Sequence, residues 1–407
     1  MKKALKIFLC LILIVSIPLS LCGCIFYGIN GMADLFEDGE PVIVPDKESS
    51  GEEDYHAKVD EIVGLLEEYY VDGYSDEELG DYLASAVVAS AGDRWSYYIS
   101  AEEYDDYVEQ NNNAYVGIGV TIQLTTEEDP GFTIVSVTSN SPAYEAGLKN
   151  GDMIVALEGA SVIELGMSET QGRVKGEAGT DVTLTILRDG AEFDVTITRG
   201  LVEVDVVVYE LMANGVGYIR INNFDANCSR DTLAAIEDLC GQGASSLIFD
   251  LRFNPGGRKN ELVEVLDYLL PEGPLFRSVD YDGNEEIDYS DESFLDLPMA
   301  VLVNEDSYSA AEFFAAAMQE YGAGIIVGTK TTGKANYQQT FRLSDGSAIA
   351  ISTGHYQTPN GVTLEGLGVT PDVIVEVDDE TYLALYYDEV EKENDAQLQA
   401  AIAALTE

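Results

Sequence analysis

Basic side chains are scarce in this sequence. Among 407 residues, 21 are Lys or Arg and 74 are Asp or Glu, so the formal net charge is −53 at pH 7. Nucleic-acid binding needs a basic face that neutralises phosphates, so the composition argues against nucleic acid as a partner. The same charge disfavours anionic membrane surfaces, and spread acidity of this kind is typical of a solvated, self-repelling surface.

Histidine and cysteine are also few. There are two histidines, His56 and His355, and five cysteines, three of which lie in the first 24 residues. The other two, Cys228 and Cys240, flank a stretch with helical spacing that would hold them about 18 Å apart. A disulfide needs Cα atoms within about 7 Å, so these two are expected to be buried free thiols. No Cys/His cluster suggests zinc, and we expect no metal or other cofactor.

The first residues, "MKKALKIFLCLILIVSIPLSLCGC", place two lysines before a long apolar run. Residues 1–23 are therefore interpreted as a secretion signal or membrane anchor. The end of this segment, Leu21 to Cys24, resembles a bacterial lipobox, which implies cleavage before Cys24 and acylation of its thiol. The alternative is an uncleaved transmembrane helix. Both interpretations place the rest of the chain outside the cytoplasm, tethered to the membrane of a bacterial cell.

Five further segments follow, and together they predict a multidomain α/β protein. Residues 24–54 are acidic and contain two prolines, which indicates a flexible linker. Residues 55–110 have helical periodicity, and residues 111–200 contain short strands and turns. Residues 201–380 alternate strands with helices, which predicts a layered core with parallel strand pairing. Residues 381–407 end in a further helical pattern.

The 111–200 segment resembles a PDZ domain. The resemblance is carried by "YVGIGV" (115–120), "SPAYEAGLKNGDMIVALEG" (141–159) and "GTDVTLTILRDG" (179–190). It implies that an extended peptide adds to an exposed sheet edge and that bare amides receive its terminal carboxylate. The expected peptide-binding residues are Val116, Ile118, Gly119 and Val120.

The stretch "GTKTTGKANYQ" (328–338) contains the G-x-x-x-x-G-K pattern of a phosphate-binding loop. In such a loop Lys334 would bind the phosphates of a nucleotide. That loop needs a Ser or Thr after the lysine and a helix beginning there. Here Ala335 follows, and the next residues alternate around an Asp-Gly turn, which predicts a hairpin. Nucleotide binding is therefore disfavoured.

A nucleophile is suggested by "NEDSYSAAE" (304–312), where a strand is expected to give way to a helix. Ser309 and Glu312 fit a capping box, and capping alone could explain this serine. The same place would set helix amides beside an oxyanion. The base could be His355 or Lys334. A lysine base must be neutral, so its pKa must fall from about 10.4 to about 7–8 through apolar burial.

These stretches together resemble the carboxyl-terminal processing peptidases, the S41 family of serine peptidases with a Ser-Lys dyad. The similarity spans about residues 53–405 and includes "NEDSYSAAE", "TTGKANYQ" (331–338) and "DLRFNPGG" (250–257). It implies that Ser309 is the nucleophile, Lys334 the general base and Gln338 the residue that orients the lysine. It also implies an oxyanion hole made by the amide of Gly256 or Gly257 with that of Ala310. Tyr308 replaces the small residue usual beside the nucleophile.

The expected function is a membrane-tethered serine endopeptidase that acts on proteins with accessible, apolar C-terminal tails bound by the PDZ domain. The resemblance further implies a homodimer. The alternative is a catalytically inactive or autoinhibited peptide-binding scaffold at the cell surface, which loss of Ser309, Lys334 or Gln338 would have favoured. All three residues are present.

Overall fold

The computed structural model describes residues 54–124, 126 and 129–406. The signal or anchor segment, most of the acidic linker and Cys24 lie outside these residues. Within the described residues, no helix combines the length and apolar character needed to cross a bilayer. Contacts divide the chain after Tyr74. The first part contains α1 (Tyr55–Tyr69), which is capped by Asp54 and buries none of its side chains.

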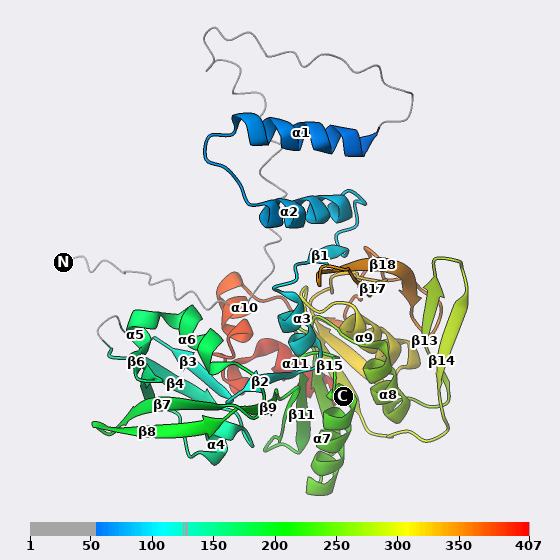
Figure 1. Ribbon diagram of the computed structural model, residues 1–407. Helices are drawn as coiled ribbons and strands as arrows, with labels where there is room; N and C mark the ends of the chain where they lie inside the picture. The colour runs from blue at the N-terminus through cyan, green and yellow to red at the C-terminus, as the bar shows by residue number, and fades with distance from the viewer. Residues whose placement is uncertain (1–53, 125, 127–128, 407) are drawn as a thin grey trace, which may run out of the picture. The chain divides into compact units, whose positions relative to one another are not determined.

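The PDZ region of the second part is a sheet ordered β3-β4-β5-β7-β8. Alternation in β7 buries Val182, Leu184 and Ile186 against the rest of this sheet and its short helices. The hairpin turn at Asp189-Gly190 was predicted correctly, and both residues have positive φ. Strand β3 is the last strand at one edge of the sheet (Figure 1). The elements are β3 (Val120–Gln123), β4 (Phe132–Val137), β5 (Met153–Leu157), β6 (Ala160–Ser161), β7 (Asp181–Arg188), β8 (Ala191–Thr198), α4 (Pro142–Glu145), α5 (Val162–Leu165) and α6 (Met167–Val174).

The core is built on a sheet ordered β10-β11-β12-β15-β16-β19, in which all pairs from β11 onward are parallel. This confirms the predicted mixed α/β class. Strands β12 and β15 are fully buried and send alternate residues to two apolar clusters, one packed against α7–α9 and the other against α11. The elements are β10 (Val207–Leu211), β11 (Val216–Ile221), α7 (Cys228–Gln242), β12 (Ser246–Asp250), α8 (Lys259–Leu269), β15 (Met299–Val303), α9 (Ala310–Tyr321), β16 (Gly324–Gly328), β19 (Val373–Ile374), α10 (Asp379–Tyr386), η1 (Lys392–Asn394) and α11 (Ala396–Ala404).

A second, antiparallel sheet contains the hairpin that follows Lys334 in the sequence. Strands β17 (Asn336–Arg342) and β18 (Ala348–Gln357) form the predicted hairpin, and β18 also pairs with β13 (Gly273–Asp280), which pairs with β14 (Glu285–Ser290). The outer neighbour of β18 is β1 (Tyr97–Ile99). The 55–110 segment, predicted to be a helical region, therefore also contains this short strand. That segment also contains α2 (Asp76–Ala89) and α3 (Tyr104–Asn111), and β2 (Ala114–Gly117) pairs with β9 (Gly200–Glu203).

Candidate active site

Ser309 lies where β15 gives way to α9, as the sequence predicted. Its backbone has φ 57° and ψ −125°, a strained conformation for a residue with a side chain. The capping box is present, and the Glu312 carboxylate accepts the Ser309 N–H at 3.0 Å. Strain of this kind persists only when neighbouring contacts enforce it, and it is concentrated at functional sites.

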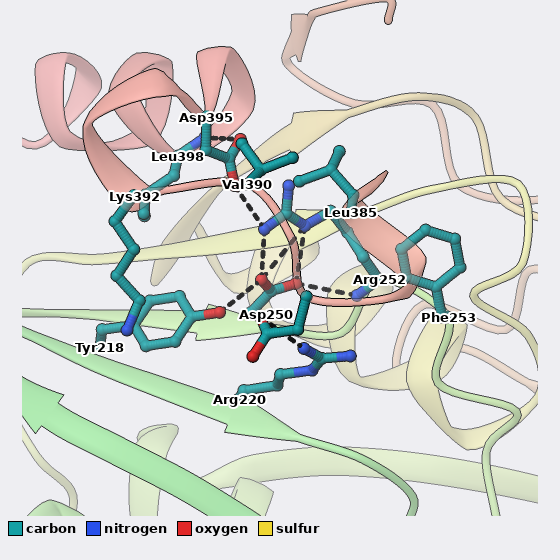
Figure 2. A pocket seen from close by; sticks show the side chains of 11 residues that line it. Tyr218, Arg220, Asp250, Arg252, Phe253, Leu385, Val390, Lys392, Asp395 and Leu398 are labelled. Carbon is teal, nitrogen blue, oxygen red and sulfur yellow. Dashed lines mark hydrogen bonds and ion pairs between the residues drawn. The ribbon is translucent and has the colours of Figure 1, made fainter. Parts of the chain in front are cut away.

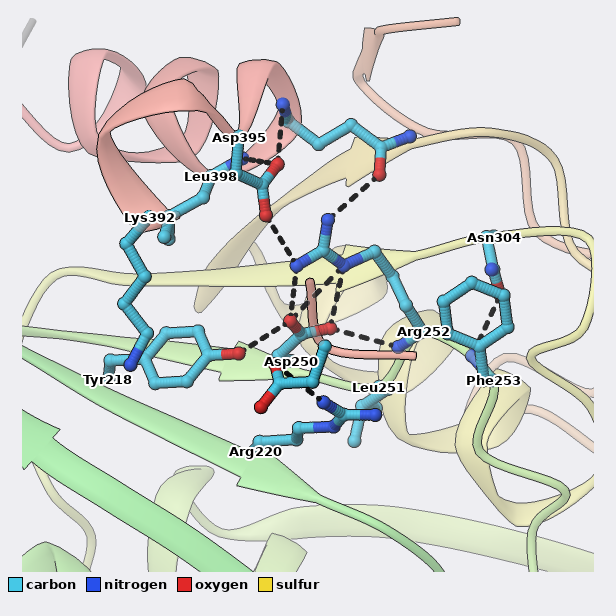
Figure 3. Close-up of polar contacts among 12 residues, drawn as sticks. Tyr218, Arg220, Asp250, Leu251, Arg252, Phe253, Asn304, Lys392, Asp395 and Leu398 are labelled. Atoms are coloured by element: carbon cyan, nitrogen blue, oxygen red, sulfur yellow. Dashed lines mark hydrogen bonds and ion pairs between the residues drawn. The ribbon is translucent and has the colours of Figure 1, made fainter. Parts of the chain in front are cut away.

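Those contacts come from the loop after β12. Phe253 N–H donates to Asn304 Oδ1 at 2.9 Å, as Figure 3 shows, and Tyr308 N–H donates to the Asn254 carbonyl at 3.1 Å. A Cβ at Gly256 would lie 2.7 Å from Ser309 Cβ, so only glycine fits there. Residues 251–258 are called the glycine loop below, and residues 304–309 the serine loop. The two loops are joined by hydrogen bonds and by close packing.

Arg252, at the start of the loop after β12, is held by a network of polar contacts (Figures 2 and 3). Its guanidinium binds Asp250 through Nε and Nη2, and Nη2 also donates to Asp395 Oδ2 at 2.8 Å. Gln397 accepts from Nη1 at 3.1 Å, and the Tyr218 hydroxyl donates to Asp250 at 2.8 Å. Burial would raise the pKa of Asp250, but Arg252 holds it below its usual value. The cluster is a buried, paired ion network.

A small cavity of about 20 Å³ opens beside this network and is lined partly by Tyr218, Arg252 and Asp395 (Figure 2). Neither Ser309 nor Lys334 lines it. The cavity is therefore part of the surroundings of the buried ion network and does not include these two residues.

Residues 329–335, called the lysine loop below, are hydrogen-bonded to the same Glu312 carboxylate that caps α9. Glu312 is fully buried, and its Oε2 accepts the N–H groups of both Ser309 and Lys334, at 3.0 and 2.8 Å. Its Oε1 accepts from Thr331 Oγ1 at 2.5 Å and from the Gly333 N–H at 2.6 Å. One side chain thus brings together the main chains of two residues that are 25 positions apart.

The Lys334 amine lies among aromatic rings. Its Nζ is 4.8 Å from the centre of the Trp95 ring and 5.6 Å from that of Tyr308. Burial lowers the pKa of this amine to about 8, although the charges of Asp93, Glu312 and Glu365 act in the opposite direction. Within the described residues, the amine makes no direct hydrogen bond to Ser309. Catalytic hydrogen bonds are often long before a substrate binds.

Gln338 lies close to the lysine loop but contacts other groups. Its Nε2 donates to the Asn336 carbonyl and to Ser352 Oγ, each at 3.0 Å. Its role in orienting Lys334 stays a prediction. His355 is exposed and its Nδ1 is paired with Asn336, and within the described residues no hydrogen bond joins it to Ser309.

Of the backbone amides expected to form the oxyanion hole, one already has a hydrogen-bond acceptor in the described part of the chain and two do not. The Gly256 N–H already donates to Asn254 Oδ1 at 2.8 Å. The amides of Gly257 and Ala310 have no acceptor within the described residues. A Cβ at Gly256 would lie 2.8 Å from Ala310 N, so this glycine loop closely approaches the Ala310 amide.

Of the four expected peptide-binding residues, Ile118, Gly119 and Val120 lie just before or at the start of β3, the edge strand, whereas Val116 lies in β2 and is paired with β9. Ile118 is buried, and Gly119 has φ 82° and is so close to Ser141 that a Cβ would lie 2.3 Å from its Cβ. The amides of Ile118 and Gly119 have no acceptor among the described residues. Val116 donates to Glu109 at 3.4 Å, and Val120 begins β3.

Sequence reasoning missed the contribution of residues 93–96 to this site. Neither Trp95 nor Asp93 was singled out from the sequence as a residue of the site. Two signals were available, a lone tryptophan and a short turn ahead of aromatic β-formers, but neither identifies a partner far away in sequence. The two cysteines are free, as predicted, although Cys240 is only half-buried.

Comparison with known proteins defines the class. A model of peptidase family S41 matches residues 215–375, and a PDZ domain model matches residues 116–198. The molecule is thus a peptidase with a PDZ domain.

The particular family follows from whole-chain relatives. The carboxyl-terminal-processing protease of Synechocystis sp. is 33% identical over 84% of this chain and 81% of its own length. The carboxy-terminal processing protease CtpA of Bacillus subtilis is 29% identical over 96% and 81%. The solved photosystem II D1 C-terminal processing protease is 26% identical over 77% of this chain and 86% of that one, with a TM-score of 0.45. This chain belongs to the carboxyl-terminal processing proteases of family S41.

Proposed function

We propose that this protein is a serine endopeptidase in which Ser309 is the nucleophile and Lys334 the general base. The observation that carries the proposal is the Glu312 carboxylate, which holds the main chains of both residues, together with a lysine amine buried enough to be neutral near pH 8. A neutral amine can accept a proton, whereas an ordinary surface lysine cannot do so at this pH.

In the proposed reaction, Ser309 Oγ attacks the peptide carbonyl carbon while Lys334 Nζ takes the hydroxyl proton. The oxyanion that forms would be stabilised by the unoccupied amides of Gly257 and Ala310, with Gly256 shaping the loop. The lysine ammonium then protonates the leaving amine, and an acyl-enzyme remains. Water hydrolyses this ester, with Lys334 again acting as the base.

The PDZ domain is proposed to select the substrate. The open edge of β3 and the unpaired amides of Ile118 and Gly119 suit an extended chain that ends in a carboxylate. The proposed substrates are proteins with accessible, apolar C-terminal tails. Attachment to the membrane through an acylated Cys24 or an N-terminal helix, an extracytoplasmic location and a homodimer complete the proposal.

Cleavage by single variants tests this assignment. The full-length chain is incubated with an unfolded protein that has an apolar C-terminal tail, and fragments are identified by mass spectrometry. Ser309→Ala and Lys334→Ala are each expected to lower kcat by about 10⁴-fold or more, because a dyad acts as a unit. Retention of near-parental cleavage by either variant would refute the dyad.

Binding separates the enzyme from a peptide-binding scaffold. Ser309→Ala should still bind the tail peptide with the parental Kd, because the PDZ edge is unchanged. If the parent binds the tail yet cleaves no substrate under any tested condition, the scaffold assignment replaces the enzyme.

A further inference from the structure

Residues 93–96 lie far outside the protease match, yet they contact the lysine loop. Besides its contact with the Lys334 amine, the Trp95 ring stacks on Tyr308 with 5.9 Å between ring centres. The Arg94 guanidinium lies 4.1 Å from the centre of the Trp95 ring. The lysine is therefore enclosed on one side by a residue next to the nucleophile and on another by the segment before β1.

Asp93 connects this segment to Gln338. Its Oδ2 accepts from Ser96 Oγ at 2.5 Å, and its Oδ1 accepts the Trp95 N–H at 3.0 Å. Ser352 N–H donates to Ser96 Oγ at 3.0 Å, and Ser352 Oγ accepts from Gln338. A continuous chain of hydrogen bonds thus leads from Gln338 to the Asp93 carboxylate.

We infer that Asp93 is a positioning residue for Lys334, and that Trp95 and Tyr308 form the wall that excludes water from its amine. The inference rests on the proposed role of Lys334 as the base. In this arrangement Gln338 acts on the lysine indirectly, by fixing Ser352 and through it Asp93.

The other charged groups around the lysine are less suited to orient it. Glu312 uses its two oxygens for four donors, and Glu365 accepts the Ala335 N–H at 2.8 Å. Arg94 repels an ammonium. Asp93 remains: burial would raise the pKa of its carboxyl, but hydrogen bonds from Ser352 and Ser96 and the charge of Lys334 keep it below the usual value. The charge of this carboxylate acts on the amine and raises the pKa of Lys334.

Two variants are expected to move the pH profile in opposite directions. Asp93→Asn removes an anion, so the pKa of Lys334 should fall and the acid limb of kcat/KM should move to lower pH. The plateau kcat should also fall roughly 10- to 100-fold, because the amine is misplaced. Trp95→Ala admits water, so the acid limb should move to higher pH.

Two further variants serve as controls. Asp345→Asn removes an aspartate that accepts two hydrogen bonds from Ser347 at the β17–β18 turn, and it should leave the profile unchanged. Asp93→Glu keeps the charge and should keep the acid limb near that of the parent. A loss of activity that is equal at every pH, without displacement of the limb in Asp93→Asn, would overturn the inference.

A direct titration separates the inference from the proposed function. The Ser309→Ala protein is labelled with 13C-lysine, and the NMR signal of Lys334 is assigned as the one that Lys334→Arg removes. This signal should titrate near pH 8, and at a lower pH after Asp93→Asn. If it titrates near 8 in both, Asp93 has no such role while the base assignment stands. If it titrates near 10.5 without the Asp93 change, the base assignment itself fails.

Discussion

Glu312 is the residue that links the main chains of the two members of the proposed dyad. Sequence reasoning identified it as a helix cap, and it caps α9 as expected. The structure adds that the same carboxylate holds Thr331, Gly333 and Lys334. A capping box can be predicted from three residues of spacing, whereas a contact over about twenty positions depends on tertiary packing.

A buried lysine amine should cost stability. Its pKa of about 8 lies below the unfolded value of 10.5, so below pH 8 the folded state holds a poorly solvated charge. Lys334→Met is expected to abolish cleavage and to raise the free energy of unfolding by up to roughly 3 kcal/mol at pH 6.

The increase in unfolding free energy caused by Lys334→Met should shrink as the pH rises from 8 to 10.5. Over this range the amine of the parent is neutral in the folded state and becomes neutral in the unfolded state. Urea unfolding at several pH values measures the increase. Lys330→Met, which changes an exposed lysine of the same loop, is the control and should change the free energy little. A destabilised Lys334→Met protein at pH 6 would contradict the burial argument.

Among the elements, the C-terminal segment contacts both the loop after β12 and the loop before α9. Rings of α10 pack on Phe253, and the Tyr382 hydroxyl donates to Asp306 in the serine loop. At the start of α11, Asp395 binds Arg252 directly (Figure 3). A helix here was predicted from sequence, but its partner was not, because Arg252 and Asp395 are 143 residues apart.

Asp395→Asn tests this support. Asparagine can still cap α11, so the change mainly removes a buried charge beside Arg252. We expect a loss of about 3 kcal/mol in unfolding free energy and a lower kcat with KM little changed, because the Arg252–Asn254 loop would be less well fixed.

The matched control is Asp388→Asn. It also removes an arginine ion pair from the C-terminal segment, but the Asp388 side chain is 87% exposed. Its effect should stay within about 0.5 kcal/mol. Equal effects of the two variants on stability and kcat would show that the buried pair has no special role.

Local patterns predicted most elements of the core. The parallel strands are continuous apolar runs, and the β17–β18 hairpin follows from its Asp-Gly turn, so both are encoded within short windows. Strand β1 was missed because its three residues are stabilised by pairing with β18, some 250 positions later. The same pairing brings Trp95 and Asp93 to the lysine, which no local window could show.

For the molecule as a whole, the net charge of −53 should affect substrate choice. An acidic tail approaches a repelling surface, so it should be cleaved more slowly than a neutral apolar tail, and added salt should reduce the difference. Cleavage of paired tail peptides at about 0.05 and 0.5 M NaCl measures this. A ratio that does not change with salt would contradict a long-range charge effect.

The most direct test of the account is the pH dependence of kcat/KM for the parental chain. If neutral Lys334 is the base, the rate should rise about tenfold per pH unit below pH 8 and level off above it. A rate that stays flat between about pH 6 and 9 would contradict the claim that this amine accepts the proton of Ser309.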